Sequence, residues 1–157
     1  MESLDTFLNY LPDVALKFAA CMICGGIIGI ERGYRGKPIG PRTSILICFG
    51  AALYVFIAKI ITDVYPNMQY DPSRIVSQIV VGVGFIGAGS IIRAGGNIVG
   101  LTTAATIWVV AGIGACIGFG YPLLVLAVSI LVLITLIILR SFETKFLDRE
   151  EPEVNQD

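Results

Sequence analysis

Five long apolar runs dominate this sequence and restrict what it can fold into. Each is about 17 to 20 residues long, which is the length that an α-helix needs to cross the hydrocarbon core of a bilayer. Of the 157 residues, 55% are hydrophobic and only 15% are charged. We therefore expect an all-α membrane protein with a transmembrane domain over residues 1–140 and spans near residues 14–30, 45–61, 75–92, 101–119 and 122–139.

Lysine and arginine are unevenly divided between the two sides that these spans would create. Of the 11 such residues, eight follow the first, third or fifth span, while Lys17, Lys59 and Arg74 are assigned to the opposite side. Short loops rich in these residues stay in the cytoplasm. We predict an outside N-terminus, a cytoplasmic C-terminus and a short cytoplasmic tail over residues 141–157. The polar first residues carry no basic segment or cleavage site, so we expect the first span to be retained.

The chain weakly resembles itself when it is shifted by sixty positions. Gly40 and Thr43 then align with Gly100 and Thr103, and Gly29 aligns with Gly89. Each unit would hold two spans, so the two units would be parallel and related by an axis along the membrane normal. This predicts two parallel two-helix repeats plus a fifth helix. Chance similarity between helices rich in Gly and Ala is the alternative.

Pairs of small residues four positions apart occur in three of the expected spans. They are Gly25 with Gly29, Gly84 with Ala88, and Gly114 with Gly118. Because apolar burial cannot drive association within lipid, helices there associate through close packing of small residues. These faces offer more packing surface than five helices need. We therefore expect a homodimer with the first or the third pair at its contact.

Four segments of the chain resemble the MgtC/SapB family of bacterial membrane proteins. They are Gly29-Ile-Glu-Arg32, Gly40-Pro-Arg-Thr43, the run from Asp71 to Gly89, and the run from Gly100 to Trp108. The resemblance implies a bacterial plasma-membrane protein associated with magnesium homeostasis, growth at low magnesium and survival inside host cells. It also implies a regulator of other membrane proteins, such as magnesium transporters or ATP synthase. A small transporter of magnesium or another ion is the alternative.

The residues themselves disfavour the conduction of magnesium. This ion needs about six oxygen ligands, yet none of the five apolar cores contains Asp or Glu. Glu31 is the one carboxylate expected at a cytoplasmic helix end, and it is surrounded by Arg32, Arg35, Lys37 and Arg42. A helix end with these positive charges repels cations and attracts phosphate groups or anionic lipid. Backbone carbonyls at a glycine-rich break or in an oligomeric pore would be the remaining route for an ion.

Two helices are expected to begin on the cytoplasmic side, near Arg42 and Thr102. Free N–H groups at a helix start carry partial positive charge, so two such starts beside arginines would form an anion-attracting pocket. We expect Glu31 to hold Arg42 and Arg93 there or to close the pocket when no ligand is bound, and we expect Arg35→Ala to be mild. The predicted functional cluster is Glu31, Arg32, Arg42, Thr43, Arg93, Thr102 and Thr103. Its ligand would be an anion or magnesium. Alternatively, Glu31 and Arg32 simply anchor helix ends at the interface.

Polar residues elsewhere have structural explanations. Asp71 before Pro72 is suited to cap a helix, and Gln78 is suited to hydrogen-bond a neighbouring helix. Asp71, Arg74, Gln78 and Asn97 are further candidates for the functional site. The sequence defines no set of metal ligands.

Catalysis and nucleic-acid binding find little support. The chain contains no histidine, which removes histidine-based triads and the commonest metal ligand. Cys21 and Cys24 lie in an apolar helix, and no second cysteine pair has suitable spacing, so we expect buried thiols. The net charge is −1 and there is no basic stripe. We predict a protein that is not an enzyme and whose partners are the lipid bilayer, a second copy and other membrane proteins.

Overall fold

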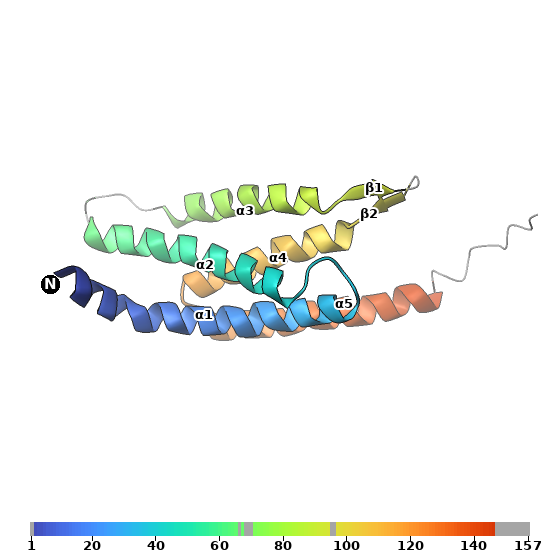
Figure 1. Ribbon diagram of the computed structural model, residues 1–157, viewed down its shortest axis with the longest axis horizontal. Coiled ribbons are helices and arrows are strands. Elements are labelled where there is room, and N and C mark those ends of the chain that lie inside the picture. The colour runs from blue at the N-terminus through green and yellow to red at the C-terminus, as the bar shows by residue number, and fades with distance from the viewer. Residues whose placement is uncertain (1, 66, 68–70, 95–96, 147–157) are drawn as a thin grey trace, which may run out of the picture.

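The computed structural model describes residues 2–65, 67, 71–94 and 97–146. Helices and one small hairpin follow one another in the order α1 (Glu2–Tyr34), α2 (Pro41–Val64), α3 (Pro72–Gly89), β1 (Ile92–Ala94), β2 (Asn97–Val99), α4 (Leu101–Gly118) and α5 (Pro122–Phe146). The helices lie roughly along one direction (Figure 1). All five are long and apolar enough to cross a membrane. This confirms the expected all-α transmembrane fold.

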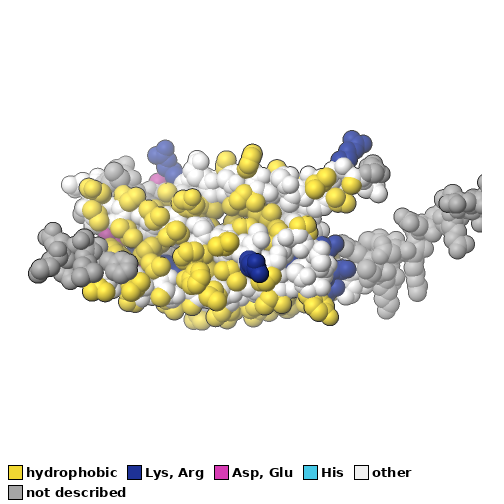
Figure 2. Space-filling view, viewed as in Figure 1, with side chains coloured by type: hydrophobic (Ala, Val, Ile, Leu, Met, Phe, Trp, Pro, Cys, Tyr) yellow, Lys and Arg dark blue, Asp and Glu magenta, His cyan; other side chains and the backbone are white. Residues whose placement is uncertain are grey.

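The two ends of the bundle differ in what they hold (Figure 1). The hairpin end has the end of α1, the starts of α2 and α4, the β-hairpin and the end of α5. The opposite end, which we call the Asp71 end, has the starts of α1, α3 and α5. Figure 2 shows hydrophobic side chains over most of the visible face and several Lys and Arg side chains gathered at the hairpin end. From these charges we still predict that the hairpin end faces the cytoplasm.

The third span ends earlier than predicted. Ser90 caps α3, and the next residues enter a two-stranded antiparallel hairpin in which Ile92 pairs with Val99, Arg93 with Ile98 and Ala94 with Asn97. Residues 95 and 96, which connect the strands, lie outside the described residues. Periodicity alone does not separate a short apolar strand from the end of an apolar helix. For this reason the sequence predicts a helix as far as residue 92 and does not predict the two strands.

α4 is the central helix of the bundle. It contacts each of the other four helices, and its packing against α2 is the most extensive in the molecule. Glycines make this approach possible, because a Cβ at Gly114 would lie 1.9 Å from the carbonyl oxygen of Cys48 and one at Gly118 would lie 2.6 Å from the Cβ of Val55. Gly25 also faces α2, where a Cβ would lie 3.1 Å from the oxygen of Ser44.

Two of the predicted glycine pairs therefore serve packing within one chain. α2 covers Gly114, Gly118 and Gly25, and a Cβ at Gly29 would lie 2.6 Å from the Cα of Pro41. These pairs do not form an open face for the dimer contact in which we expected them. The Gly84 pair is also not a helix contact, because nothing lies within 4 Å of a Cβ at Gly84.

The hydrophobic core lies between α1, α2, α4 and α5. Its buried side chains are Cys21, Cys24, Ile28, Cys48, Ala52, Val110, Ile113, Ile117 and Val125. This confirms the prediction that Cys21 and Cys24 are buried thiols. α3 contributes to a second, smaller cluster, in which its Ile79 packs with side chains of α2 and α4: Ala51, Val55, Ala111 and Ala115.

The predicted repeat is not confirmed, although both units begin a helix after a glycine. α2 follows Gly40 and α4 follows Gly100. The two glycines differ, since Gly40 has φ −95° and Gly100 has φ +96°. A Cβ at Gly100 would lie 2.0 Å from the oxygen of Ser90, so only glycine fits there. Gly29 packs on α2, whereas a Cβ at Gly89 would have nothing within 4 Å.

Candidate functional site

A buried arginine links the end of α1 to the start of α4. Arg32 lies in the last turn of α1 and is 5% exposed. Its Nη2 donates a hydrogen bond of 2.8 Å to Oγ1 of Thr103, which lies 71 residues away in the sequence and is 3% exposed. Hydrogen bonds of a charged group are stronger than neutral ones. The structure thus brings together two of the predicted site residues.

Local sequence places both partners at this junction. A positive side chain is favoured at the C-terminal end of a helix, where the peptide dipoles leave partial negative charge, and Arg32 is in that position. The left-handed conformation of Gly100 lets the hairpin return against the end of α3 and begin α4. No side chain caps the start of α4. Thr103 belongs to the first turn of α4, so the Arg32 guanidinium lies at the start of this helix.

Glu31 pairs with Arg35, one turn further along α1. Nε of Arg35 lies 2.5 Å from Oε1 of Glu31, whose side chain is 8% exposed. We expected Glu31 to hold Arg42 and Arg93, but among the described residues no ion pair joins it to either. A pair four residues apart on one helix needs only two adjacent turns. Arg35 therefore lies in the same cluster as Glu31, and the mild effect expected of Arg35→Ala stays a prediction.

Three buried polar atoms near this junction have no hydrogen-bond partner within the described part of the chain. They are Oε2 of Glu31, Nε of Arg32 and Oγ of Ser44. Ser44 is fully buried on α2, and its Oγ would lie 2.9 Å from a Cβ at Gly29, one turn before Arg32. An unsatisfied buried polar group costs about 1–3 kcal/mol. Such atoms are expected to meet a water molecule or a ligand.

A third helix brings another arginine to the same place. α5 packs against α1, and its Arg140 acts electrostatically on Arg32, although less than Glu31 does. Arg140 was not among the predicted site residues, although an arginine directly after an apolar run of this length was a usable signal. We call Glu31, Arg32 and Arg35 the buried cluster, after the buried Arg32 side chain and the buried Glu31 carboxylate. Two guanidinium groups and one carboxylate give it an excess of positive charge, which favours anions.

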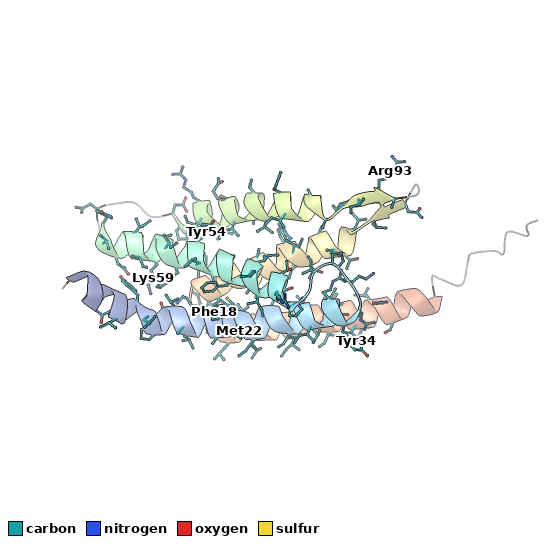
Figure 3. All side chains as sticks on the ribbon, in the orientation of Figure 1. Phe18, Met22, Tyr34, Tyr54, Lys59 and Arg93 are labelled. Carbon is teal, nitrogen blue, oxygen red and sulfur yellow. The ribbon has the colours of Figure 1, made fainter. Side chains whose placement is uncertain are left out.

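The remaining predicted residues of the hairpin end are exposed. Arg42 and Thr43 lie in the first turn of α2, Thr102 lies in the first turn of α4, and Asn97 lies on β2. Arg93 is exposed on β1, and Figure 3 shows its side chain at the outer part of the hairpin, pointing away from the helices. The structure therefore leaves Arg42 and Arg93 outside the buried cluster.

Asp71 and Arg74 lie at the opposite end and are exposed. Oδ1 of Asp71 accepts hydrogen bonds from the backbone N–H and the hydroxyl of Ser73, over 2.9 and 2.7 Å. Pro72 is the first residue of α3, so the predicted helix cap is confirmed. The two bonds from Ser73 stabilise the carboxylate and lower the pKa of Asp71.

Gln78 lines a groove between α2 and α3 and is exposed there. The groove encloses about 820 Å³. Thr43 and Tyr54 contribute its other polar groups, and Figure 3 shows Tyr54 beside α3. Gly50 and Gly82 also line it, and a Cβ on either would have nothing within 4 Å. The groove is therefore lined mostly by apolar side chains, and it has free space beside Gly50 and Gly82.

A second buried charge lies nearer the Asp71 end and was missed by sequence reasoning. Lys17 is 8% exposed, pairs with Asp13 one turn earlier, and places its Nζ 5.4 Å from the centroid of the Phe56 ring on α2. Tyr10 donates a 3.3 Å hydrogen bond to Asp63, which joins the same two helices. The spacing of Asp13 and Lys17 by four residues was the signal that predicts this pair.

No group of three Cys, Asp or Glu side chains is placed to hold a metal ion within the residues that the structure describes. The buried cluster supplies one carboxylate and several cations instead.

The chain matches known proteins over most of its length. The sequence model of the MgtC family matches residues 18–145. YhiD of Escherichia coli K12, named as a proposed magnesium transporter, is 44% identical over 133 residues, which cover 83% of this chain and 61% of YhiD. Protein MgtC of Salmonella typhimurium LT2 is 43% identical over 125 residues, 80% of this chain and 52% of MgtC.

Protein SapB of Bacillus subtilis is 38% identical over 114 residues, 70% of this chain and 49% of SapB. The chain thus spans about half to three fifths of the length of these relatives. No solved structure matches. The five apolar helices and these relatives together indicate a bacterial inner-membrane protein.

Proposed function

This chain belongs to the MgtC family, and on that premise we propose that it serves magnesium homeostasis as a regulator of other membrane proteins. In this role it supports growth of a bacterium at low magnesium without catalysing a reaction. Its partners would be membrane proteins such as magnesium transporters or ATP synthase.

The buried cluster at the hairpin end is the observation that supports regulation. Arg32 and Arg35 carry positive charge in or beside the membrane edge, and Arg140 lies near Arg32. A magnesium ion that entered here would be repelled by these groups and would meet one carboxylate that is already paired with Arg35. The same charges suit an anionic ligand or an acidic segment of a partner protein.

Orientation is part of this proposal. The positive residues at the hairpin end whose side chains the structure describes are Arg32, Arg35, Lys37, Arg42, Arg93 and Arg140. Under the positive-inside rule this end faces the cytoplasm. The buried cluster would then be reached from the compartment in which a regulator senses the state of the cell.

A transporter of magnesium or another ion is the second candidate. The name of YhiD favours it, and so does the pair of Lys17 with Asp13, because ionisable residues inside a membrane often mark ion pathways. A transporter would require this pair to change partners during transport.

We further propose that two copies associate through the α2–α3 groove. Gly50 and Gly82 are the open small residues on its walls, and small residues let helices from another chain approach closely. Gly82→Leu would fill the groove without touching the core and should abolish a dimer in nanodiscs. A wild-type chain that is monomeric in both nanodiscs and mild detergent would contradict this contact.

Two measurements made on one set of variants test the regulator against the transporter. Arg32→Gln should lose complementation of growth at low magnesium, with Arg93→Gln as the matched control at an exposed arginine. Asp13→Asn tests the ion pair. Purified protein in liposomes with a magnesium-sensitive dye should show no flux for any of them. Robust magnesium flux that Asp13→Asn removes would overturn the regulator in favour of the transporter.

A further inference from the structure

We propose that the buried cluster binds a phosphate-bearing anion, which is held by the Arg32 guanidinium and the free N–H groups at the start of α4. The inference names a ligand class for the site on which the proposed function rests. The site is defined by the contacts, burial and charges at the junction of α1 and α4.

The first step is the incomplete coordination of Arg32. Guanidinium presents five N–H donors in a planar fork that matches the oxygens of a phosphate. Nη2 donates to Oγ1 of Thr103, while Nε is buried and has no partner among the described residues. A buried donor of a charged group without an acceptor is costly. An anion beside Nε would remove that cost.

The second step is the start of α4, to which Arg32 points. The first N–H that bonds within this helix is that of Ala104, which donates to the oxygen of Gly100 over 2.9 Å. The N–H groups of Leu101, Thr102 and Thr103 precede it and have no acceptor inside the helix. No side chain caps them. The hydrogen bond to Thr103 thus brings the guanidinium to the same end of α4 as a set of free donors.

The third step is the charge around this end. Arg32 and Arg35 are two guanidinium groups beside the carboxylate of Glu31, which pairs with Arg35 through Oε1. These three residues therefore carry one more positive than negative charge, and burial of that charge is costly without a counter-ion. The start of α4 adds partial positive charge. A cation would be repelled here, and a phosphate oxygen would be attracted.

A ligand could reach the start of α4 from outside the protein. Leu101 and Thr102 are exposed, while Thr103 and Arg32 are buried. The start of α4 therefore has exposed residues directly before the turn that meets the buried guanidinium. A soluble phosphate could enter from the water, and the headgroup of an anionic phospholipid could enter from the membrane edge. The shared chemistry is a phosphate oxygen that accepts from Arg32 and from backbone N–H groups.

The experiment uses the purified full chain in a maltoside detergent, which contributes no phosphate. In the soluble arm, thermal unfolding is measured with inorganic phosphate against chloride at equal ionic strength. In the lipid arm, nanodiscs contain either phosphatidylglycerol or a neutral galactolipid, and native mass spectrometry counts the phospholipid retained by the protein. A rise in the unfolding midpoint with phosphate, or retained phosphatidylglycerol, is the expected result. The arm that responds identifies the source.

Variants decide whether the ligand lies at Arg32. Arg32→Gln should weaken binding by at least about tenfold, which corresponds to about 1.4 kcal/mol. Arg32→Lys can still donate to Thr103 and keeps the charge, so it preserves the helix link while it removes Nε and the fork. It should also weaken binding. Arg93→Gln is the matched control and should bind like the parent.

Three results would overturn the inference. The first is that neither arm responds, which would mean that the cluster holds water only. The second is that both Arg32 variants bind like the parent. The third is that Arg93→Gln weakens binding as much as Arg32→Lys does. Binding is measured without growth at low magnesium, so the two proposals can fail separately. Normal binding by a chain that has no effect on growth would contradict the proposed function and leave the anion site in place.

Discussion

Replacing Thr103 with valine should loosen the junction between α1 and α4. Valine keeps the volume and the branched shape of threonine but removes the hydroxyl that accepts from Nη2 of Arg32 at 2.8 Å. The bond involves a charged donor, and both residues are at most 5% exposed. Loss of such a bond costs about 1.5–3 kcal/mol, and burial places the expected value in the upper half of that range. Thr103→Ser keeps the hydroxyl and should cost less.

Reversible unfolding in mixed micelles of maltoside and dodecyl sulfate measures the free energy of unfolding of each variant. Thr106→Val is the matched control on the same helix, because Thr106 is 4% exposed and its hydroxyl donates only to the Thr102 carbonyl of its own helix. It should cost about 0.5–1.5 kcal/mol. If Thr103→Val is as stable as Thr103→Ser, or no less stable than Thr106→Val, the link contributes nothing and the reasoning is refuted.

Four further predictions concern the Glu31–Arg35 pair, the packing of Gly114, the cap at Asp71 and the orientation in the membrane. Glu31→Ala and Arg35→Ala should each cost about 1–3 kcal/mol, and the double variant should cost less than their sum; full additivity in the same unfolding assay would exclude the pair. Gly114→Ala should cost about 3 kcal/mol or more because its Cβ would lie 1.9 Å from the Cys48 oxygen, whereas Gly112→Ala meets open space and should be tolerated; equal stability would contradict the packing. The hydrogen bonds from Ser73 lower the pKa of Asp71 in the folded protein. They therefore stabilise the fold at pH values above the pKa of an unfolded aspartate, and this stabilisation is lost as the pH falls through the lower pKa of the folded state. Asp71→Asn should flatten that part of the curve of stability against pH, and an unchanged curve would count against the cap. In a chain whose native cysteines are replaced, Asn67→Cys should react with an impermeant maleimide in intact cells and Asn97→Cys only after lysis; the reverse would overturn the orientation.

Much of the fold could be read from single stretches of sequence. The spans depend on apolar length, and the cap at Asp71 depends on three adjacent residues, so both were predictable from local physics. The hairpin was not, because strands of three residues between two helices carry too few side chains to show a period of two. The same limit explains why Arg93 was assigned to the cluster instead of an exposed strand.

The site was only partly predictable. Arg32 and Thr103 were both among the expected residues, but the sequence did not show that they touch each other. Glu31 was expected to bind arginines of other segments and instead pairs within its own helix. The pair of Lys17 with Asp13 could have been predicted from their spacing, whereas the burial of Lys17 against α2 depends on how the helices pack. The approach of Arg140 to Arg32 likewise depends on the packing of α5 on α1.

Composition along the chain is enough to predict five membrane-spanning helices with positive charges gathered at one end, because the free energy of transfer into lipid depends on the residues of each helix. It does not predict which glycines become helix contacts or which arginine is buried. Those outcomes depend on the relative rotation of the helices, which is set by close packing between residues far apart in the chain, such as Gly114 against Cys48 and Arg32 against Thr103.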